Sequence, residues 1–247
     1  MTHTPVALIT GAAQRIGAET ARLLHREGYN IVVHYHHSAD DAEKLCAELN
    51  AQRNDSALPL PAELRDIASV QALATNTIQH WGRVDALVNN ASGFYPTPLA
   101  SASGDDWDSL FGSNVKGAFF LSQALAPTLS QHQGAIVNIV DIYGDRPLPQ
   151  HSIYSMAKAA LAMMTKSLAI ELGPNVRVNG VSPGAILPPM ASDEFGELEE
   201  RNVSERVPLA RWGAPANIAT TVSFLLNKTS YINGQIIAVD GGRSLSV

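Results

Sequence analysis

Short apolar runs alternate with longer segments of helical character along the chain. The first run, residues 6–10, ends at a glycine, as expected of a buried strand. Residues 12–27 then predict a helix, which Gly28 is expected to end. The same pattern predicts further strands at 30–35, 56–61, 85–89, 135–140, 176–181 and 235–239, and further helices at 39–50, 69–81, 106–131 and 152–172.

The strands are near-continuous apolar runs, which is typical of strands covered on both faces. Strands that alternate with helices predict an α/β fold, namely a doubly wound, Rossmann-type parallel sheet of about seven strands with helices on both faces. No repeat or linker divides the chain, so residues 1–247 are expected to form one dinucleotide-binding and catalytic domain. Residues 182–206 are rich in proline, glycine and acids and predict a substrate loop.

Composition narrows the function classes. Apolar residues make up 45% of the chain and charged residues 16%, and the net charge is −6 without a basic tract, which argues against nucleic-acid binding. The apolar runs are shorter than the ~20 residues of a membrane helix, and residues 1–5 lack the pattern of a secretory leader. Cys46 is the single cysteine, which excludes an internal disulfide and a thiolate zinc site. We therefore expect a cytoplasmic protein without a resident metal.

The turn at residues 10–17 is a candidate phosphate site. Gly11 permits a tight turn, and Gly17 permits close packing or close approach of a cofactor. The N-terminus of the following helix offers N–H groups and a partial positive charge to a pyrophosphate. The spacing does not fit G-x-G-x-x-G, so a plain structural turn is the alternative interpretation.

The end of the second predicted strand bears on the cofactor. NAD-specific sites usually carry an acid there, whereas this chain has His34-Tyr35-His36-His37-Ser38 and no acid before Asp40. Histidines, a hydroxyl and the nearby Arg15 suit a 2′-phosphate, which favours NADP(H). The alternative is that these histidines are only polar residues at a strand end.

Tyr154 and Lys158 are the candidate catalytic pair. Their i, i+4 spacing at the start of a predicted helix places both side chains on one face. A free tyrosine has a pKa of about 10, and a nearby ammonium is expected to lower that pKa. The pair therefore predicts a tuned general acid/base.

These motifs, taken together, resemble those of the short-chain dehydrogenase/reductase family. The glycine turn matches T-G-x-x-x-x-x-G, with Arg15 where many members have glycine. Tyr154 and Lys158 match the family's catalytic Y-x-x-x-K. Further matches are Asn89-Asn90-Ala91 beside the cofactor, Asn114 as the active-site asparagine whose helix distortion positions a water and the lysine, Pro183-Gly184 at the nicotinamide, and Asp240-Gly241-Gly242 near the C-terminus.

Asp141 departs from the family pattern. The family usually places a serine thirteen residues before the tyrosine, where this chain has Asp141. An ionised Asp141 would repel a developing alkoxide, which argues against simple ketone reduction and suits a substrate with N–H donors or a C=N bond. Burial could also keep Asp141 protonated as a donor. An ordinary loop acid is the alternative.

Residues 89–99 resemble the corresponding loop of the pteridine reductases, a subgroup of that family. The resemblance implies that Phe94 stacks a pterin and that Ser92 bonds to it. Two positions differ from the subgroup: His37 stands where eukaryotic members tend to have arginine, and Glu63-Leu64 replaces Asp-Leu at the adenine. The implied substrate residues are Arg15, Ser92, Phe94, Asp141 and Tyr154, and the implied cofactor residues are Gly11, Arg15, Ile16, Gly17, Tyr35, His36, His37, Ser38, Glu63, Leu64, Asn90, Ala91, Ser92, Tyr154, Lys158, Pro183 and Gly184.

The sequence therefore predicts an NADPH-dependent pteridine reductase that transfers hydride to a C=N bond of a pterin or dihydropterin. Tyr154 is the expected proton donor. A carbonyl reductase acting on a ketoacyl thioester, sugar or ketone is the first alternative, and a non-catalytic dinucleotide-sensing module is the second. The resemblance also implies a homotetramer built on the helices at 106–131 and 152–172.

Overall fold

The computed structural model describes residues 4–186, 203 and 205–246. Within these ranges seven parallel strands form one sheet in the order β3-β2-β1-β4-β5-β6-β7. This confirms the predicted doubly wound parallel sheet. The strands are β1 (Val6–Ile9), β2 (Asn30–Tyr35), β3 (Ala57–Pro61), β4 (Ala86–Asn89), β5 (Ala135–Ile139), β6 (Arg177–Pro183) and β7 (Ile236–Val239).

The order of the strands reverses beside β1. Val6 is paired with Asn30 of β2 on one side, and Ala7 is paired with Ala86 of β4 on the other. In such sheets the crevice at the carboxyl ends of the strands, next to the reversal, is where ligands bind. The candidate residues at the ends of β1, β2, β4, β5 and β6 therefore share one edge of the sheet.

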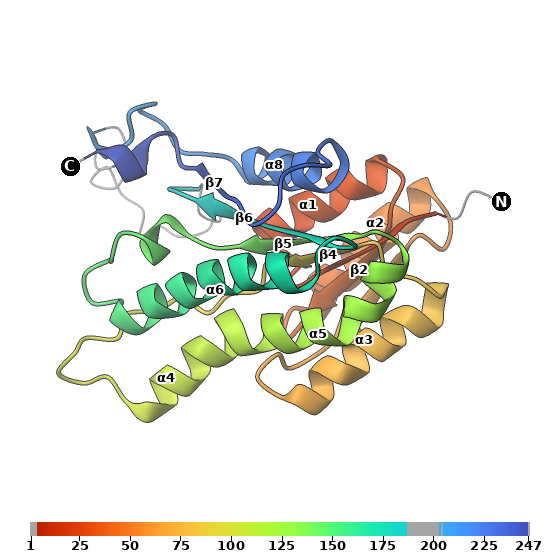
Figure 1. Ribbon diagram of the computed structural model, residues 1–247, viewed down its shortest axis with the longest axis horizontal. Helices are drawn as coiled ribbons and strands as arrows, with labels where there is room; N and C mark the ends of the chain where they lie inside the picture. Colours follow the sequence, from red (N-terminus) through yellow and green to blue (C-terminus); the bar gives the residue numbers. More distant parts are fainter. Residues whose placement is uncertain (1–3, 187–202, 204, 247) are drawn as a thin grey trace.

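Helices cover both faces of the sheet (Figure 1). On one face lie α1 (Arg15–Arg26), α2 (Ala39–Gln52) and α8 (Pro215–Asn227), and on the other lie α3 (Ile67–Trp81), α5 (Gly117–Gln131) and α6 (Ser152–Glu171). The shorter α4 (Gly104–Phe111) precedes a π-helix, Gly112–Lys116, that leads directly into α5. None of the helices in the described ranges is long and apolar enough to cross a bilayer.

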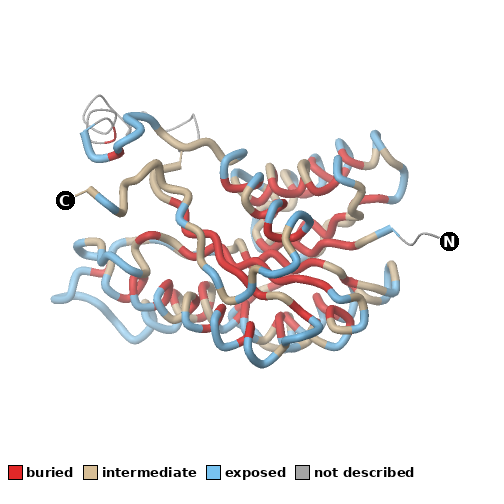
Figure 2. The backbone as a smooth tube through the Cα atoms, turned by 45° about the horizontal axis from the view of Figure 1, so that its top comes forward, coloured by how far each residue is buried: buried red, intermediate tan, exposed pale blue. Residues whose placement is uncertain are grey.

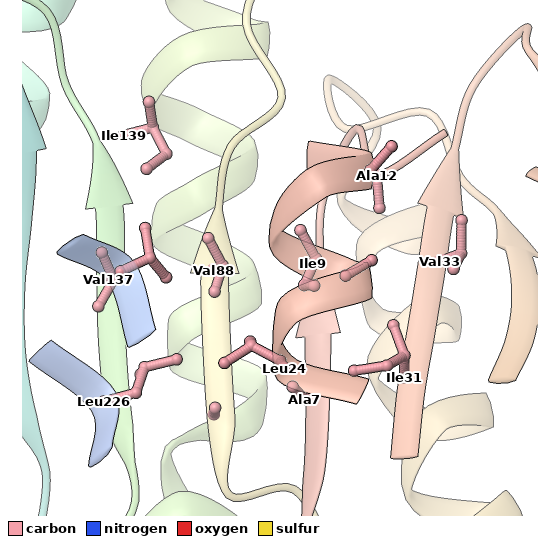
Figure 3. Packing of buried hydrophobic residues seen from close by; sticks show 14 of the residues in the cluster. Ala7, Ile9, Ala12, Leu24, Ile31, Val33, Val88, Val137, Ile139 and Leu226 are labelled. Carbon is pink, nitrogen blue, oxygen red and sulfur yellow. The ribbon is translucent and has the colours of Figure 1, made fainter. Parts of the chain in front are cut away.

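Alternation along each strand divides the core into two layers. Ala7 and Ile9 of β1 pack against α1, α2 and α8, whereas Leu8 packs against α3, α5 and α6. Figure 3 shows the first layer, in which Leu24 of α1 and Leu226 of α8 lie over the strands. The inner strands β1, β4 and β5 are buried at every position (Figure 2), and each fully buried aliphatic side chain contributes about 1.5–3 kcal/mol.

Several element boundaries differ from the sequence prediction. The first helix begins at Arg15 rather than at residue 12, because the phosphate turn occupies the intervening residues. The helix predicted at 106–131 is interrupted by the π-helix, since Asn114 diverts backbone bonding there. Strand β6 continues to Pro183, which shortens the predicted loop, and residues 187–202 and 204 of that loop lie outside the described residues.

Helix α8 was not predicted from the sequence. It begins with Pro215 in its first turn, where proline fits because its missing N–H would have no helical partner. Its buried residues include Ile218, Val222 and Leu225, whose spacing follows one helix face. That spacing was the available signal, and the proline-rich segment before it obscured the start of the helix.

Candidate active site

Asp141 and Tyr154 meet at the carboxyl edge of the sheet. Asp141 follows β5, and Tyr154 lies in the first turn of α6. The Tyr154 hydroxyl donates to Asp141 Oδ2 at 2.8 Å, while Asp141 Oδ1 accepts from the backbone N–H of Tyr143 at 2.9 Å. Both carboxylate oxygens therefore have a partner, and one partner is the candidate proton donor.

Lys158 is a buried cation on the same face of α6. Its side chain is 1% exposed, and Nζ lies 5.7 Å from the centroid of the Tyr154 ring. Nζ donates to the carbonyl of Ile139 at 3.0 Å. Burial lowers the pKa of Lys158 to about 8, against a smaller raising effect of Asp141. The predicted shared face is confirmed.

The expected lowering of the Tyr154 pKa is wrong. Burial raises the pKa of Tyr154 above its ordinary value, and the charge and hydrogen bond of Asp141 raise it further. Ser92 acts weakly in the opposite direction. Burial also raises the pKa of the Asp141 carboxyl, against smaller lowering effects of Tyr143, Lys158 and Tyr154. Tyr154 is consequently protonated at neutral pH and is suited to give a proton rather than to take one.

Asn114 lies inside the π-helix, so the predicted helix distortion is present at the predicted residue. Asn114 Nδ2 donates to the carbonyls of Leu110 at 2.9 Å and Gly93 at 3.0 Å, and its Oδ1 accepts from the Ser92 hydroxyl at 2.7 Å. Since Asn114 is 1% exposed, these bonds fix the loop that carries Ser92 and Phe94 against the helix.

Phe94 lies against Tyr154, the candidate proton donor. Its ring meets the Tyr154 ring edge-on at 4.8 Å between centroids and is stacked on His151 at 4.8 Å. Phe94 is 56% exposed, which is unusual for an aromatic ring that has only an anchoring role. An exposed ring beside Tyr154 can stack a flat heteroaromatic substrate. Sequence reasoning did not identify His151, although it lies only three residues before Tyr154.

The phosphate turn is held closely against β4. Gly11 has φ +60°, and a Cβ on Gly17 would lie 2.4 Å from the Gly11 carbonyl oxygen. Asn90 Nδ2 donates to the Gly11 carbonyl at 3.0 Å, and the backbone N–H of Ala91 donates to the Thr10 hydroxyl at 3.0 Å. The two glycines and Asn90 are thus required by packing within the turn.

Arg15 begins α1 with a left-handed backbone, φ +51°. Glycine adopts this conformation readily, whereas other residues adopt it at a cost in free energy. The first turn of α1, which includes Ile16, presents backbone N–H groups at the crevice beside β1. Such N–H groups, together with an arginine, form a donor set that fits an anionic dinucleotide.

The end of β2 carries the residues predicted for a 2′-phosphate. Tyr35 ends the strand, and the exposed rings of His36 and His37 lie 3.6 Å apart. Ser38 occupies the predicted N-cap position of α2, but its hydroxyl makes no capping bond.

The Glu63 carboxylate lies beside His36, a contact that the sequence did not predict. Glu63 Oε2 lies 3.3 Å from His36 Nε2 and 2.8 Å from Arg65 Nη2, and the hydrogen bond from Arg65 is the main cause that lowers the pKa of Glu63 to about 2. The adjacent Leu64 is buried in the core. Glu63 thus stays ionised and paired with Arg65.

Pro183 and Gly184 lie at the carboxyl end of β6, beside the end of β7. A Cβ on Gly184 would lie 2.5 Å from Asp240 Cβ, so this turn has space only for glycine. Asp240 in turn accepts from the backbone N–H groups of Gly242 at 2.9 Å and Ser244 at 2.7 Å. The two turns that resembled family motifs therefore pack on each other.

The comparisons with known proteins agree with these motifs. A family model described as enoyl-(acyl carrier protein) reductase matches residues 11–244. Pteridine reductase 1 of Leishmania tarentolae is 40% identical over 98% of this chain and 97% of its own length. The chain belongs to the short-chain dehydrogenase/reductase family. It is an oxidoreductase of that family, and a nicotinamide dinucleotide is its cofactor.

Relatives named for a different activity have a similar sequence identity to this chain. The 3-oxoacyl-[acyl-carrier-protein] reductase FabG of Staphylococcus aureus is 37% identical over 98% of this chain and 99% of its own length. A putative ketoacyl reductase of the granaticin polyketide synthase of Streptomyces violaceoruber is 37% identical over 98% of this chain and 97% of its own length. Identity alone therefore does not separate pterin from ketoacyl substrates.

Proposed function

We propose that this short-chain dehydrogenase/reductase is an NADPH-dependent pteridine reductase that reduces a C=N bond of a pterin or dihydropterin. The observation that carries the proposal is the 2.8 Å hydrogen bond between Tyr154 and Asp141, at the position where the family usually has serine. A carboxylate there accepts hydrogen bonds from the N–H groups of a pteridine, whereas it repels a developing alkoxide. The exposed Phe94 ring supplies a stacking surface for a flat heterocycle.

Tyr154, Asp141 and Lys158 have separate roles in the proposed reduction. A nicotinamide dinucleotide supplies the hydride when bound. Tyr154 donates its hydroxyl proton to the ring nitrogen, so the C=N bond gains one hydride and one proton. Asp141 orients the Tyr154 hydroxyl before the transfer, and the Lys158 ammonium beside the ring stabilises the resulting phenolate. Because burial and Asp141 raise the pKa of Tyr154, its proton is present at neutral pH.

NADPH is proposed over NADH because the segment after β2 carries the exposed His36 and His37, and Glu63, the carboxylate beside His36, is paired with His36 and Arg65. A paired carboxylate repels a 2′-phosphate less than an isolated one does. A kinetic preference for NADH would contradict this part of the proposal.

A ketoacyl reductase is the second candidate, because the FabG relative is nearly as similar as the pteridine reductase. A panel that follows NADPH oxidation with dihydrobiopterin, dihydromonapterin, dihydrofolate, an acetoacetyl thioester and simple ketones separates the two. We expect turnover of at least one pterin that exceeds turnover of every ketone. Turnover of the thioester or of ketones but of no pterin would overturn the proposal.

We also propose a homotetramer that uses the face formed by α4, α5 and α6 (Figure 1). This face has an open hollow of about 1320 Å³ lined in part by Phe119 and Phe120. Phe119 of α5 and Met163 and Ile170 of α6 are exposed apolar side chains, which is typical of an interaction surface. Light scattering of the wild type should give four times the 26.3 kDa chain mass. Met163→Glu should give a smaller species, whereas a monomeric wild type would contradict the proposal.

A further inference from the structure

His34 lies between two segments of the cofactor crevice and has a different environment from the other histidines at the end of β2. It is 1% exposed, whereas His36 and His37 are exposed. Its Nδ1 accepts from the backbone N–H of Gly11 at 3.0 Å, and its Nε2 lies 3.2 Å from the carbonyl oxygen of Ala62. One imidazole therefore joins the phosphate turn after β1 to the segment after β3.

The hydrogen-bond partners determine the form of this imidazole. The Gly11 N–H can only donate, so Nδ1 of His34 must be unprotonated, and the Ala62 carbonyl can only accept, so Nε2 must carry the proton. The neutral Nε2–H tautomer is the one form that satisfies both partners. Burial lowers the pKa of His34 to about 4; the bond to Ala62 and the charge of Glu63 raise it, and His36 lowers it, so His34 is neutral at pH 7.

His34 also decides which N–H groups the phosphate turn can offer. Its imidazole occupies the N–H of Gly11, and its backbone carbonyl accepts from the N–H of Ala12 at 2.9 Å. On the other side, Asn90 Nδ2 donates to the Gly11 carbonyl at 3.0 Å. The N–H and the carbonyl of Gly11 and the N–H of Ala12 are thus bonded within the protein, so a phosphate must take its N–H donors further along the turn, towards the start of α1.

We propose that His34 is a positioning residue. It holds the phosphate turn, at Gly11, at a fixed distance from Ala62 in the segment after β3, and it thereby supports binding of either nicotinamide dinucleotide. It acts through Gly11 and Ala62, and its effect is independent of the 2′-phosphate. The inference therefore rests on the dinucleotide cofactor of the family and not on the proposed NADPH preference.

The test is calorimetric affinity for NADPH and NADH, measured on His34→Phe, His34→Gln and the control His25→Phe. His25 is also buried, at 3% exposure, and its Nε2 lies 2.8 Å from the Ser56 hydroxyl, but it lies in the last turn of α1, away from the crevice. We expect His34→Phe to weaken both dinucleotides by the same factor, roughly tenfold, because the Gly11 donor loses its acceptor. His34→Gln should recover part of this loss, and His25→Phe should lower the melting temperature without changing either affinity.

A folded His34→Phe that binds both dinucleotides within about twofold of wild type would overturn the inference, as would a loss confined to NADPH. A wild-type preference for NADH would contradict only the proposed NADPH use. If His34→Phe does not fold, selective ¹⁵N-histidine NMR of the wild type still decides. The Nε2–H tautomer at pH 7 supports the inference, and the Nδ1–H tautomer or the cation overturns it.

Discussion

The Tyr154 hydroxyl donates a 2.8 Å hydrogen bond to Asp141 Oδ2, so the candidate proton donor is held by a carboxylate. Because Asp141 raises the pKa of Tyr154, it extends the pH range over which Tyr154 carries its proton. We expect Asp141→Asn to move the alkaline limb of the kcat profile to lower pH, since a protonated Tyr154 is needed for the reduction. An unchanged alkaline limb in a folded Asp141→Asn variant would mean that Tyr154 is not the titrating acid.

Removal of the donor itself should be more severe. Tyr154→Phe is expected to lower kcat by about 10²–10⁴-fold while still binding the dinucleotide, because the hydroxyl delivers the proton and the ring keeps its packing against Phe94. Single-turnover rates and calorimetry check the two halves of this prediction. Tyr143→Phe is the control, since Tyr143 contacts Asp141 through its backbone N–H. An active Tyr154→Phe enzyme would require another proton donor.

The fold could be predicted because its strands are buried on both faces. Val6–Ile9 is apolar and buried at every position, and such an uninterrupted apolar run predicts a buried strand without knowledge of its neighbours. The break at Asn114 was predictable only through the family resemblance. It arises from a side chain that bonds to backbone carbonyls of Leu110 and Gly93, one of them distant in the sequence.

The candidate pair Tyr154 and Lys158 could be found from spacing, but the pKa shift of Tyr154 could not. The i, i+4 rule places Lys158 and Tyr154 on one face, whereas the sign of the Tyr154 pKa shift depends on burial and on Asp141 from another element. The different environments of His34 and His36 could not be predicted from the sequence either. His34 and His36 differ by two positions, yet only His34 lies between Gly11 and Ala62, because β2 ends at Tyr35.

Arg15, a candidate cofactor residue, has an unfavourable left-handed backbone conformation. Its φ of +51° costs a non-glycine residue about 1 kcal/mol. Arg15→Gly and Arg15→Ala both remove the guanidinium, and we expect both to reduce the preference for NADPH equally. Denaturant unfolding should find Arg15→Gly more stable than Arg15→Ala by about 1 kcal/mol, because only glycine relieves the strain. Equal stability of the two variants would show that the left-handed backbone is not strained.

The neutral state of His34 should make stability depend on pH. The pKa of His34 is about 4 in the folded chain, compared with 6.5 for an unperturbed histidine, so the unfolded chain binds more protons between these values. Its contribution is complete above pH 6.5 and is lost as the pH falls towards 4, by an amount on the order of 3 kcal/mol. Urea unfolding from pH 7 to pH 4.5 should show a shallower decline for His34→Phe than for the wild type. Parallel declines would contradict the assigned neutral state.

The buried charge of Lys158 is expected to lower the free energy of unfolding of the chain. Burial lowers its pKa from 10.5 to about 8, which means that the charged form is disfavoured in the folded chain. The cost is complete below pH 8 and disappears as the pH rises from 8 towards 10.5. Lys158→Met should therefore abolish turnover and raise the free energy of unfolding at pH 7 by about 2 kcal/mol, since the apolar isostere removes the buried charge but leaves the Ile139 carbonyl without its donor.

The matched control is Lys166→Met, because Lys166 is exposed on the same helix and should change stability by less than about 0.5 kcal/mol. Chemical unfolding of the three proteins at pH 7 and at pH 10 measures the effect. The stability difference between Lys158→Met and the wild type should be large at pH 7 and small at pH 10. A Lys158→Met variant that is less stable than the wild type at both values would show that the ammonium, once bound to Ile139, is fully compensated for its burial.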